Sequence, residues 1–448
     1  MVKLNNDRIF LLTLSLPSFF ARINYKNRQE IEMKINALKG MRDILPAEQR
    51  IRDYVQRKIL ETYRASGFER ISTPILEDSE NLDKSDGGDN LNLVFKVLKR
   101  GEKLDAALAE KSGEPVSAAE LSDMGLRYDL TLPLSRFFAA NRNSLQFPFK
   151  VIQTDRVYRA ERPQKGRLRE FVQCDIDILG DSSCNAEVEL IDVTARAMLN
   201  IGFSDFTINV NDRRILRNML QTMGFAPETL DSVCITFDKL DKIGASGIEA
   251  ELREKQFPEN AVSSLVSFIS SGRQITLDSV VANCSDSSVA DDLKYVISTA
   301  QAVSGGAYKV EYSPNLVRGQ GYYTGMVFEI ASPAFSGAVG GGGRYDNMIG
   351  KFIGQDVPAV GFSISFERIC GILLEQGFQI PDEKEKCAFL YGDETPFPEV
   401  LSYAGELRKD YAVSVIRKAK KPGPQFAMLE QQGYTKFARI TDGQLTVK

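Results

Sequence analysis

The most constraining feature of this sequence is the stretch from Tyr158 to Gly180, YRAERPQKGRLREFVQCDIDILG, in which short alternating runs flank a turn. Residues two apart in a strand share one face of a sheet, so Gln173, Asp175 and Asp177 point the same way. The pattern predicts two antiparallel strands joined by the Pro163–Gly166 loop. The sequence around this hairpin therefore predicts an antiparallel sheet.

The same hairpin concentrates positive charge. From Lys150 to Glu170 there are seven basic residues and three acidic ones. Arg159 and Glu161 share one face of the first strand. A binding site and a solvated charged hairpin fit this composition about equally well, so charge alone does not separate them.

The rest of the chain predicts a mixture of helices and strands. An apolar stripe at helical spacing, closed by Gly67, predicts a helix that begins near Pro46. Pro74 lacks an N–H, so the strand expected around it should lie at an edge or an interface. Further helices are expected over 186–199 and within 215–302, strands over 308–312, 323–330 and 359–364, a linker over 381–386, and a small α/β domain beyond it.

The composition excludes several kinds of chemistry. The chain has 448 residues and no histidine, which excludes histidine general bases, Ser-His-Asp triads and histidine metal sites. Its formal net charge is −4, so any nucleic-acid binding must come from local patches. None of the six cysteines forms a C-x-x-C pair, so we predict no metal site and a reducing cytoplasm.

The N-terminus carries an apolar run, residues 9–21, behind Lys3 and Arg8. It is too short to span a bilayer and is interrupted by Thr13, Ser15 and Pro17. Residues 1–33 are therefore predicted to be an extension ahead of a natural start at Met33, with an anchor or an export signal as the alternatives.

A set of motifs in fixed order carries a resemblance to a known family. The motifs are KGMRDILP, STPILE, LRYDLTLP, ERPQKGR, QCDID, LVRGQGYYTG, GGGGRYD and VGFSISFERI. Over about residues 38–448 the chain resembles histidyl-tRNA synthetase, a class II aminoacyl-tRNA synthetase.

The resemblance implies an α+β fold, with a class II antiparallel sheet flanked by helices. The domains expected from it are a catalytic core over 34–214 and 303–380, a helical insertion over 215–302, and a shortened anticodon-binding-like α/β domain over 387–448.

The resemblance also implies roles at the nucleotide. Arg159 would hold the ATP α-phosphate, and Arg318 would bridge the substrate carboxylate and that phosphate, which makes these two arginines the catalytic pair. Glu161 would lie by the adenine or its ion, and Arg368 would cover the nucleotide. Planar guanidinium groups suit both phosphate contact and ring stacking.

At the amino acid, the resemblance implies that Asp129 and Thr131 receive the α-amino group, helped by Gln173. The imidazole pocket would contain Asp177 together with Tyr322 and Tyr323. For each tyrosine, packing in the core is an equally good expectation.

The function implied is a histidine–tRNA ligase that uses ATP with Mg²⁺, acts on histidine and tRNA(His), and forms a cytoplasmic homodimer that does not enter the membrane. The main alternative is the non-catalytic, synthetase-like regulatory subunit of ATP phosphoribosyltransferase, and a third is a synthetase paralogue that charges something other than tRNA. Arg318 and the C-terminal domain favour the ligase. Gly321, where the family usually has Asp, and the 62 residues after Lys386 favour the alternative.

Overall fold

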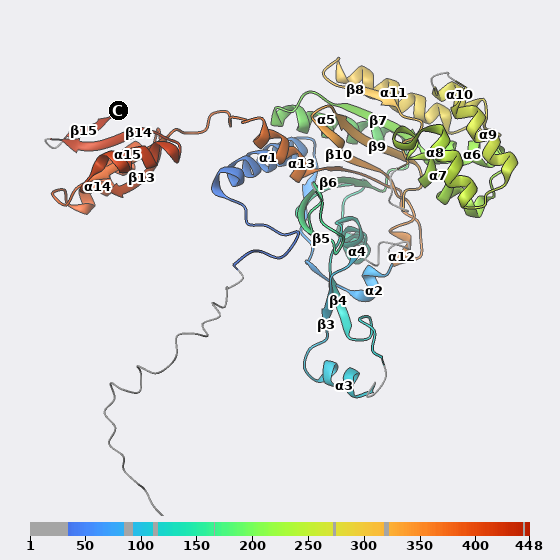
Figure 1. Ribbon diagram of the computed structural model, residues 1–448, viewed down its shortest axis with the longest axis horizontal. Helices are drawn as coiled ribbons and strands as arrows, with labels where there is room; N and C mark the ends of the chain where they lie inside the picture. Colours follow the sequence, from blue (N-terminus) through green and yellow to red (C-terminus); the bar gives the residue numbers. More distant parts are fainter. Residues whose placement is uncertain are drawn as a thin grey trace, which may run out of the picture.

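The computed structural model of the chain describes residues 35–84, 93–110, 115–164, 166–271, 275–317, 322–441 and 444–448 (Figure 1). The predicted extension over residues 1–33, Arg318 and Gly321 lie outside the described residues.

A central eight-stranded sheet organises the molecule, in the order β1, β5, β6, β11, β10, β9, β7, β8. Neighbouring strands from β5 to β7 pair antiparallel, whereas β1 with β5 and β7 with β8 pair parallel. The predicted antiparallel sheet is therefore confirmed. The strands are β1 (Glu69–Arg70), β5 (Phe149–Tyr158), β6 (Glu170–Leu179), β7 (Thr207–Asp212), β8 (Lys309–Tyr312), β9 (Met326–Ser332), β10 (Phe335–Arg344) and β11 (Ala359–Ile364).

Helices cover one face of this sheet and form the main core with it. α5 (Asn185–Ile201) and α13 (Phe366–Glu375) pack against β6, β10 and β11. α1 (Pro46–Ala65) packs against α5, α13 and β5, and α11 (Ala290–Ser304) packs against α5. Alternate residues of β6 and β11 enter this core because successive side chains of a strand point to opposite faces. They are Cys174, Ile176, Ile178, Val360, Phe362 and Ile364. The opposite side chains of these strands are thus left for another environment.

The second face of the sheet is covered only in part. A smaller apolar cluster joins it to α4 (Thr131–Asn141) and α12 (Gly350–Ile353), and includes Tyr128, Tyr322 and Tyr345. A 3-10 turn, Arg142–Ser144, follows α4. The side chains that this cluster does not cover line the cavity described below.

A small three-stranded sheet extends away from the central one (Figure 1). It contains β2 (Leu76–Asp78), β4 (Ser122–Leu126) and β3 (Lys96–Leu98) in that order, with α2 (Ser79–Leu82) and α3 (Glu102–Glu110) beside it.

The predicted single strand around Pro74 is wrong, because the chain there forms β1 and β2 in two different sheets. The fully buried Arg127 guanidinium explains the break. Its Nη1 donates to the backbone oxygen of Thr73 at 2.6 Å and to that of Pro74 at 3.4 Å. A proline has no N–H for a strand ladder, and these two carbonyls are taken by a side chain.

The chain between β7 and β8 is helical. It contains α6 (Arg213–Thr222), the 3-10 turn Pro227–Thr229, α7 (Leu230–Phe237), α8 (Leu240–Glu254), α9 (Glu259–Ile269), α10 (Leu277–Val281) and α11. These helices join the main core through residues such as Leu216, Phe237 and Leu265.

The C-terminal part forms its own α/β unit, with strand order β13, β12, β14, β15. It comprises β12 (Lys386–Tyr391), α14 (Phe397–Leu407), β13 (Ala412–Arg417), α15 (Pro422–Gln431), β14 (Tyr434–Thr441) and β15 (Gln444–Val447). Phe389 packs with α14 on one face, and Leu390 packs with Leu429 of α15 on the other. The predicted small α/β domain is therefore confirmed. In the described part of the chain, no helix is long and apolar enough to cross a bilayer.

Candidate active site

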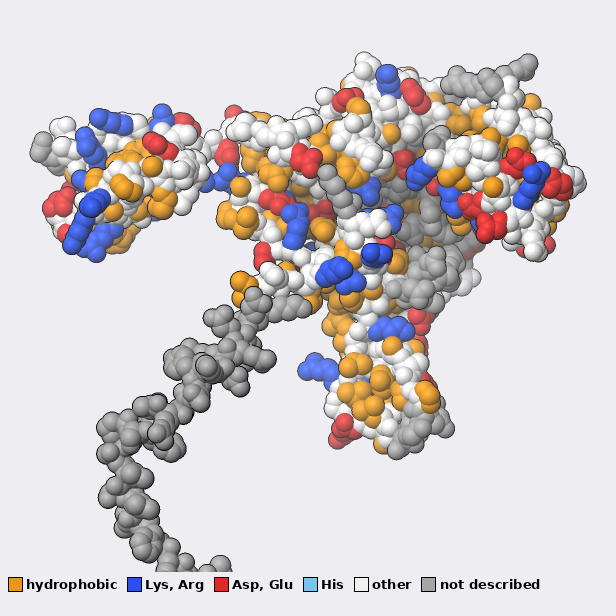
Figure 2. Space-filling view, viewed as in Figure 1, with side chains coloured by type: hydrophobic (Ala, Val, Ile, Leu, Met, Phe, Trp, Pro, Cys, Tyr) orange, Lys and Arg blue, Asp and Glu red, His pale blue; other side chains and the backbone are white. Residues whose placement is uncertain are grey.

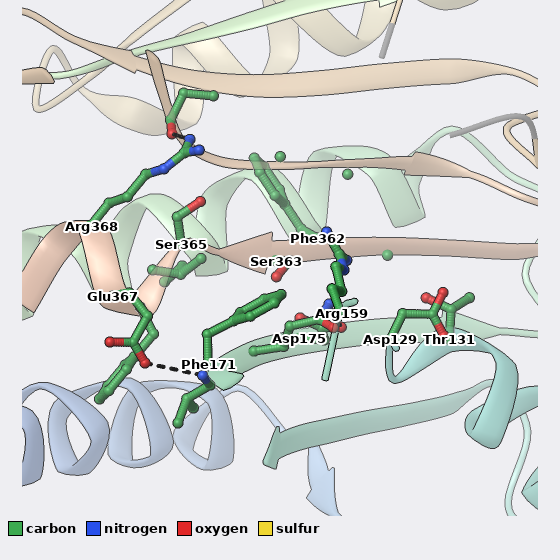
Figure 3. Close-up of a pocket in the computed structure, with 18 of the residues that line it drawn as sticks. Asp129, Thr131, Arg159, Phe171, Asp175, Phe362, Ser363, Ser365, Glu367 and Arg368 are labelled. Atoms are coloured by element: carbon green, nitrogen blue, oxygen red, sulfur yellow. Dashed lines mark hydrogen bonds between the residues drawn. The ribbon is translucent and has the colours of Figure 1, made fainter. Parts of the chain in front are cut away.

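A cavity of about 580 Å³ opens on the partly covered face of the central sheet. Nine of the ten site residues predicted from the sequence line it. They are Asp129, Thr131, Arg159, Glu161, Gln173, Asp177, Tyr322, Tyr323 and Arg368. Figure 3 shows Arg368 at one end of the cavity, Asp129 and Thr131 at the other, and Arg159 and Asp175 between them.

One end of the cavity contains the carboxylates of Asp129, Asp175 and Asp177 and is called the carboxylate end below. The register of the strands determines how it is built. On β6, Gln173, Asp175 and Asp177 face the cavity, as the alternation predicts, while the residues between them enter the main core. In the antiparallel pair of β6 with β11, Gly361 lies opposite Asp177 and Ser363 lies opposite Asp175. The two carboxylates therefore face small partners that leave room above the sheet.

Gly361 is required by close approach to Asp177. A Cβ at this position would lie 1.9 Å from Oδ1 of Asp177, far inside van der Waals contact. Any side chain at Gly361 must therefore displace the carboxylate that the sequence assigned to the pocket.

Tyr345 fixes Asp177, and sequence reasoning did not assign it a role. Its hydroxyl donates to Oδ1 of Asp177 at 2.6 Å. Its neighbour Arg344 is anchored in a buried bidentate pair with Glu187, with both N–O distances 2.6 Å. The motif GGGGRYD thus uses its arginine to hold the strand and its tyrosine to orient the pocket carboxylate.

Asp129 enters the cavity from the turn that begins α4. Its Oδ1 accepts from the backbone N–H of Leu132 at 3.2 Å, while its Oδ2 is buried without a partner among the described residues. Thr131 is the first residue of α4, and its hydroxyl interacts with that of Tyr322. Tyr322 in turn stacks edge-on against Tyr323, with ring centroids 4.8 Å apart. Both tyrosines therefore pack against neighbours and line the cavity at once.

Burial perturbs all three carboxylates. Asp129, Asp175 and Asp177 are 3%, 6% and 4% exposed. Desolvation raises the pKa of Asp129 to about 6 and that of Asp175 to about 7, and it raises the pKa of Asp177 well above its usual range, with the Asp175 charge acting in the same direction. This end of the cavity favours a bound cation or bound protons.

Two arginines also line the cavity: Arg159 lies in the middle, beside Asp175, and Arg368 lies at the end opposite Asp129, which is called the arginine end below (Figure 3). Nε of Arg159 donates to the backbone oxygen of Tyr128 at 3.0 Å, and its guanidinium lies 5.0 Å from the centroid of the Phe171 ring. The guanidinium of Arg368 lies 5.1 Å from the centroid of the Phe335 ring. Both guanidinium groups are thus held against aromatic faces, and both line the open cavity.

The loop between β5 and β6 supplies Glu161. The residue is half-buried and lies 3.5 Å from Nη1 of Arg167. Glu367, next to Arg368 in the chain, lines the cavity but is bound by groups outside it. It accepts from Arg52 at 2.6 Å and from the backbone N–H of Val172 at 3.1 Å, and so ties α1 to the turn that carries Arg368. Sequence reasoning missed this anchoring, because α1 and α13 are far apart in the chain.

Further cavity residues were not assigned a role from the sequence. Asp175 had a visible signal in its alternation with Gln173 and Asp177. Phe171 and Ser363 had none, since an aromatic residue or a serine in a strand is ordinary. Arg318, the tenth predicted residue, stays a prediction.

Comparisons with known proteins agree with the motifs. The family model for histidyl-tRNA synthetase matches residues 40–108 and 116–369. A histidine–tRNA ligase of Leifsonia xyli subsp. xyli is 41% identical over 419 residues, 90% of this chain and 94% of the relative. A probable histidine–tRNA ligase of Tropheryma whipplei is 35% identical over 426 residues, 90% of this chain and 95% of the relative.

Solved structures agree in fold. A histidyl-tRNA synthetase from Nostoc sp. PCC 7120 matches with a TM-score of 0.73 and 23% identity, over 93% of this chain and 97% of that one. A protein from Bacillus halodurans, described as an ATP phosphoribosyltransferase regulatory subunit/histidyl-tRNA synthetase, matches with a TM-score of 0.71 and 20% identity, over 91% and 98%. These likenesses show the α+β fold predicted from the sequence, and with the family match they establish that this chain belongs to the histidyl-tRNA synthetase family.

Proposed function

We propose that this chain is a histidine–tRNA ligase, which activates histidine with ATP to histidyl-adenylate and transfers the histidyl group to tRNA(His). The observation that carries the proposal is one cavity that has carboxylates at one end and Arg368 at the other, with Arg159 between them beside Asp175. Histidine has a cationic amine and an imidazole to suit the carboxylates, and ATP has phosphates to suit the arginines.

The carboxylate end supports amino-acid recognition. Oδ2 of Asp129 and Oε1 of Gln173 are buried acceptors with no partner among the described residues. An ammonium group has three donors and no acceptor, so it fits a place where acceptors lack partners. Asp177, oriented by Tyr345, is the candidate to accept from the imidazole N–H, with Tyr322 and Tyr323 beside it.

The arginines of the cavity support phosphoryl transfer that needs no histidine side chain from the protein. The carboxylate of the substrate is already ionised at neutral pH, so no general base is needed. One of its oxygens attacks the α-phosphorus, a P–O bond forms, and the bond to pyrophosphate breaks. Arg159 and Arg368, with Arg318 as predicted, would stabilise the charge that develops on the phosphoryl oxygens.

We propose that ATP enters with Mg²⁺ as part of the substrate. The described residues contain no group of three or more acidic or cysteine side chains placed to hold a metal, so a cage made by the protein alone is not expected among them. Mg²⁺ commonly uses one or two carboxylates together with substrate phosphates. Glu161, half-buried in the cavity wall, is the carboxylate that fits this part.

We also propose that tRNA contact involves the C-terminal domain. Figure 2 shows Lys and Arg side chains over this domain, and four of them are exposed between Arg417 and Lys421. Cationic side chains at such density support phosphate contact. The ligase and its tRNA would meet in the cytoplasm.

A homodimer is the third proposal. Ile75 and Leu76, beside Pro74, are 40% and 46% exposed, and β1 and β2 are edge strands of their sheets. Exposed apolar residues at an edge support a subunit contact. Light scattering at micromolar concentration tests this, and a monomer would contradict it.

The test of the function has two stages. Histidine-dependent exchange of pyrophosphate into ATP measures adenylate formation, and charging of tRNA(His) measures transfer. We expect both activities. The alternative of a regulatory subunit of ATP phosphoribosyltransferase, whose fold is shared, predicts histidine binding without either activity. A protein that binds histidine but neither exchanges nor charges would overturn the proposed function.

A further inference from the structure

Asp175 lines the cavity but has no role in the proposed binding of histidine or ATP. It lies on β6 between Gln173 and Asp177, opposite Gln153 of β5 and Ser363 of β11. It is 6% exposed and lines the cavity. Burial of an ionised carboxylate destabilises the folded protein unless the carboxylate has hydrogen-bond partners or an opposite charge nearby.

The side chains of Ser363 and Gln173 both form hydrogen bonds with Asp175. Nε2 of Gln173 donates to Oδ2 of Asp175 at 3.1 Å. A carboxamide has a donor at one end and an acceptor at the other, whereas an ionised carboxylate only accepts. When Asp175 is ionised, the reverse orientation of Gln173 would place two acceptor oxygens against each other. Asp175 therefore directs the amide nitrogen toward itself and leaves Oε1 of Gln173 to the cavity.

Other acceptors converge on the same region. Oε1 of Gln153 and Oδ2 of Asp129 are buried without a partner in the described part of the chain. Nε2 of Gln153 donates to the backbone oxygen of Leu130, next to Asp129, so this second amide is also turned with its oxygen free. A place surrounded by acceptors suits a group that carries only donors.

We propose, resting on the proposed function, that Asp175 is a positioning residue that orients the Gln173 carboxamide so that its oxygen accepts from the α-ammonium of histidine. Asp175 acts through Gln173 and does not itself need to touch the amino acid. It thus determines how well the site holds an α-amino group.

The test compares two substitutions at Asp175 in the full-length protein. Asp175→Leu removes the acceptor and keeps the number and branching of side-chain heavy atoms, so the Gln173 amide loses its fixed orientation. Loss of a hydrogen bond to a charged group should raise the KM for histidine about 10- to 100-fold, with the KM for ATP and kcat within about threefold. Asp175→Asn keeps an acceptor for Nε2, so its KM for histidine should stay within about fivefold of wild type.

A double-mutant cycle tests whether Asp175 acts through Gln173. In a Gln173→Ala background, Asp175→Leu should change the KM for histidine by less than about twofold, because there is no amide left to orient. Glu170→Gln, on the same strand but outside the cavity, is the matched control and should resemble wild type. Asp175→Ala takes the place of the leucine variant if thermal unfolding shows that the latter does not fold.

Three results would overturn the proposal. They are an unchanged KM for histidine in Asp175→Leu, an equal loss in Asp175→Asn, and a full effect of Asp175→Leu that persists without Gln173. Stabilisation of each variant by histidine in thermal unfolding provides a measure of binding that does not depend on catalysis. Wild-type protein that shows neither exchange nor this stabilisation overturns the proposed function together with this inference, whereas active wild-type protein with unresponsive variants overturns this inference alone.

Discussion

The two ends of the cavity are built in different ways. The carboxylate end is nearly dry, and its side chains are fixed by strand register and by hydrogen bonds such as that from Tyr345 to Asp177. The arginine end is more open, and Arg159 and Arg368 are half-buried and lie over aromatic rings. One end offers acceptors in fixed positions, whereas the other offers positive charge.

This difference indicates how each end tolerates change. A buried acceptor that loses its partner carries a full desolvation penalty, so the carboxylate end should discriminate strongly between ligands. Charge acts over several ångströms and depends less on exact position, so the arginine end should be sensitive to the loss of a charge rather than to small shifts. The predictions below test that contrast.

The largest effect is expected for Asp177→Ala. The variant removes the acceptor proposed for the imidazole N–H and leaves the Tyr345 hydroxyl without its partner. We expect kcat/KM for histidine to fall about 10³-fold or more, because polar sites reject mismatched partners on that scale. Pyrophosphate exchange at varied histidine measures it, and a variant that keeps both its KM and its selectivity would show that the imidazole pocket lies elsewhere.

Arg159→Ala, between the two ends of the cavity, should have the next largest effect. Removal of one preorganised charge donor should lower the exchange rate about 10²–10³-fold, with histidine binding little changed. Arg162, exposed on the same loop, provides the control, and Arg162→Ala should exchange at close to the wild-type rate. Equal losses in the two variants would mean that general positive charge on the loop, not Arg159, assists the reaction.

Gly361→Ala tests whether register fixes the carboxylate end. The added Cβ would lie 1.9 Å from Oδ1 of Asp177, so we expect a loss of about 1–3 kcal/mol in the free energy of unfolding and a raised KM for histidine. Gly371→Ala is a matched control in α13, where a Cβ meets nothing within 4 Å. It should stabilise the protein by about 0.5–1 kcal/mol. Denaturant unfolding that ranks the two variants in the opposite order would contradict this packing.

How much of this site the sequence could predict depends on the range of the interactions. The alternation along β6 is local, so the shared face of Gln173, Asp175 and Asp177 was predictable and is confirmed. The pairing of Gly361 with Asp177 was not, since it depends on how β11 packs in the core. The strand broken at Pro74 was missed for the same reason, because the Arg127 side chain reaches it from the residue that follows β4.

The smallest effect is expected from pH. The pKa of Asp129 is raised to about 6 and that of Asp175 to about 7, mainly by burial. Both groups face Arg159, Asp177 and the tyrosines of the cavity. An ammonium ligand needs them ionised, so each should weaken histidine binding by up to about tenfold per pH unit below its pKa.

Without bound histidine, the free energy of unfolding should decrease as pH rises, which is opposite to the pH dependence of histidine binding. An acid whose pKa is raised on folding binds more protons in the folded state, so its contribution falls as pH rises from about 4 to 7. Because histidine binds more tightly when Asp129 and Asp175 are ionised, thermal unfolding should show a larger stabilisation by histidine at pH 8 than at pH 6. The imidazole of the ligand also titrates in this pH range. The same scans with an analogue that lacks the α-amino group are therefore the control, because they contain the imidazole titration but not the ammonium contact with Asp129 and Asp175. An equal pH dependence for both ligands would exclude Asp129 and Asp175 as the groups that titrate.

The most direct test of the divided cavity is to measure both Michaelis constants in the exchange reaction for Asp177→Asn and Arg368→Ala. We predict a crossed pattern. Asp177→Asn should raise the KM for histidine and leave that for ATP within about threefold, and Arg368→Ala should do the reverse, because each substitution alters a contact to one substrate only. Variants that each raise both constants to the same extent would contradict the assignment of one end to histidine and the other to the nucleotide.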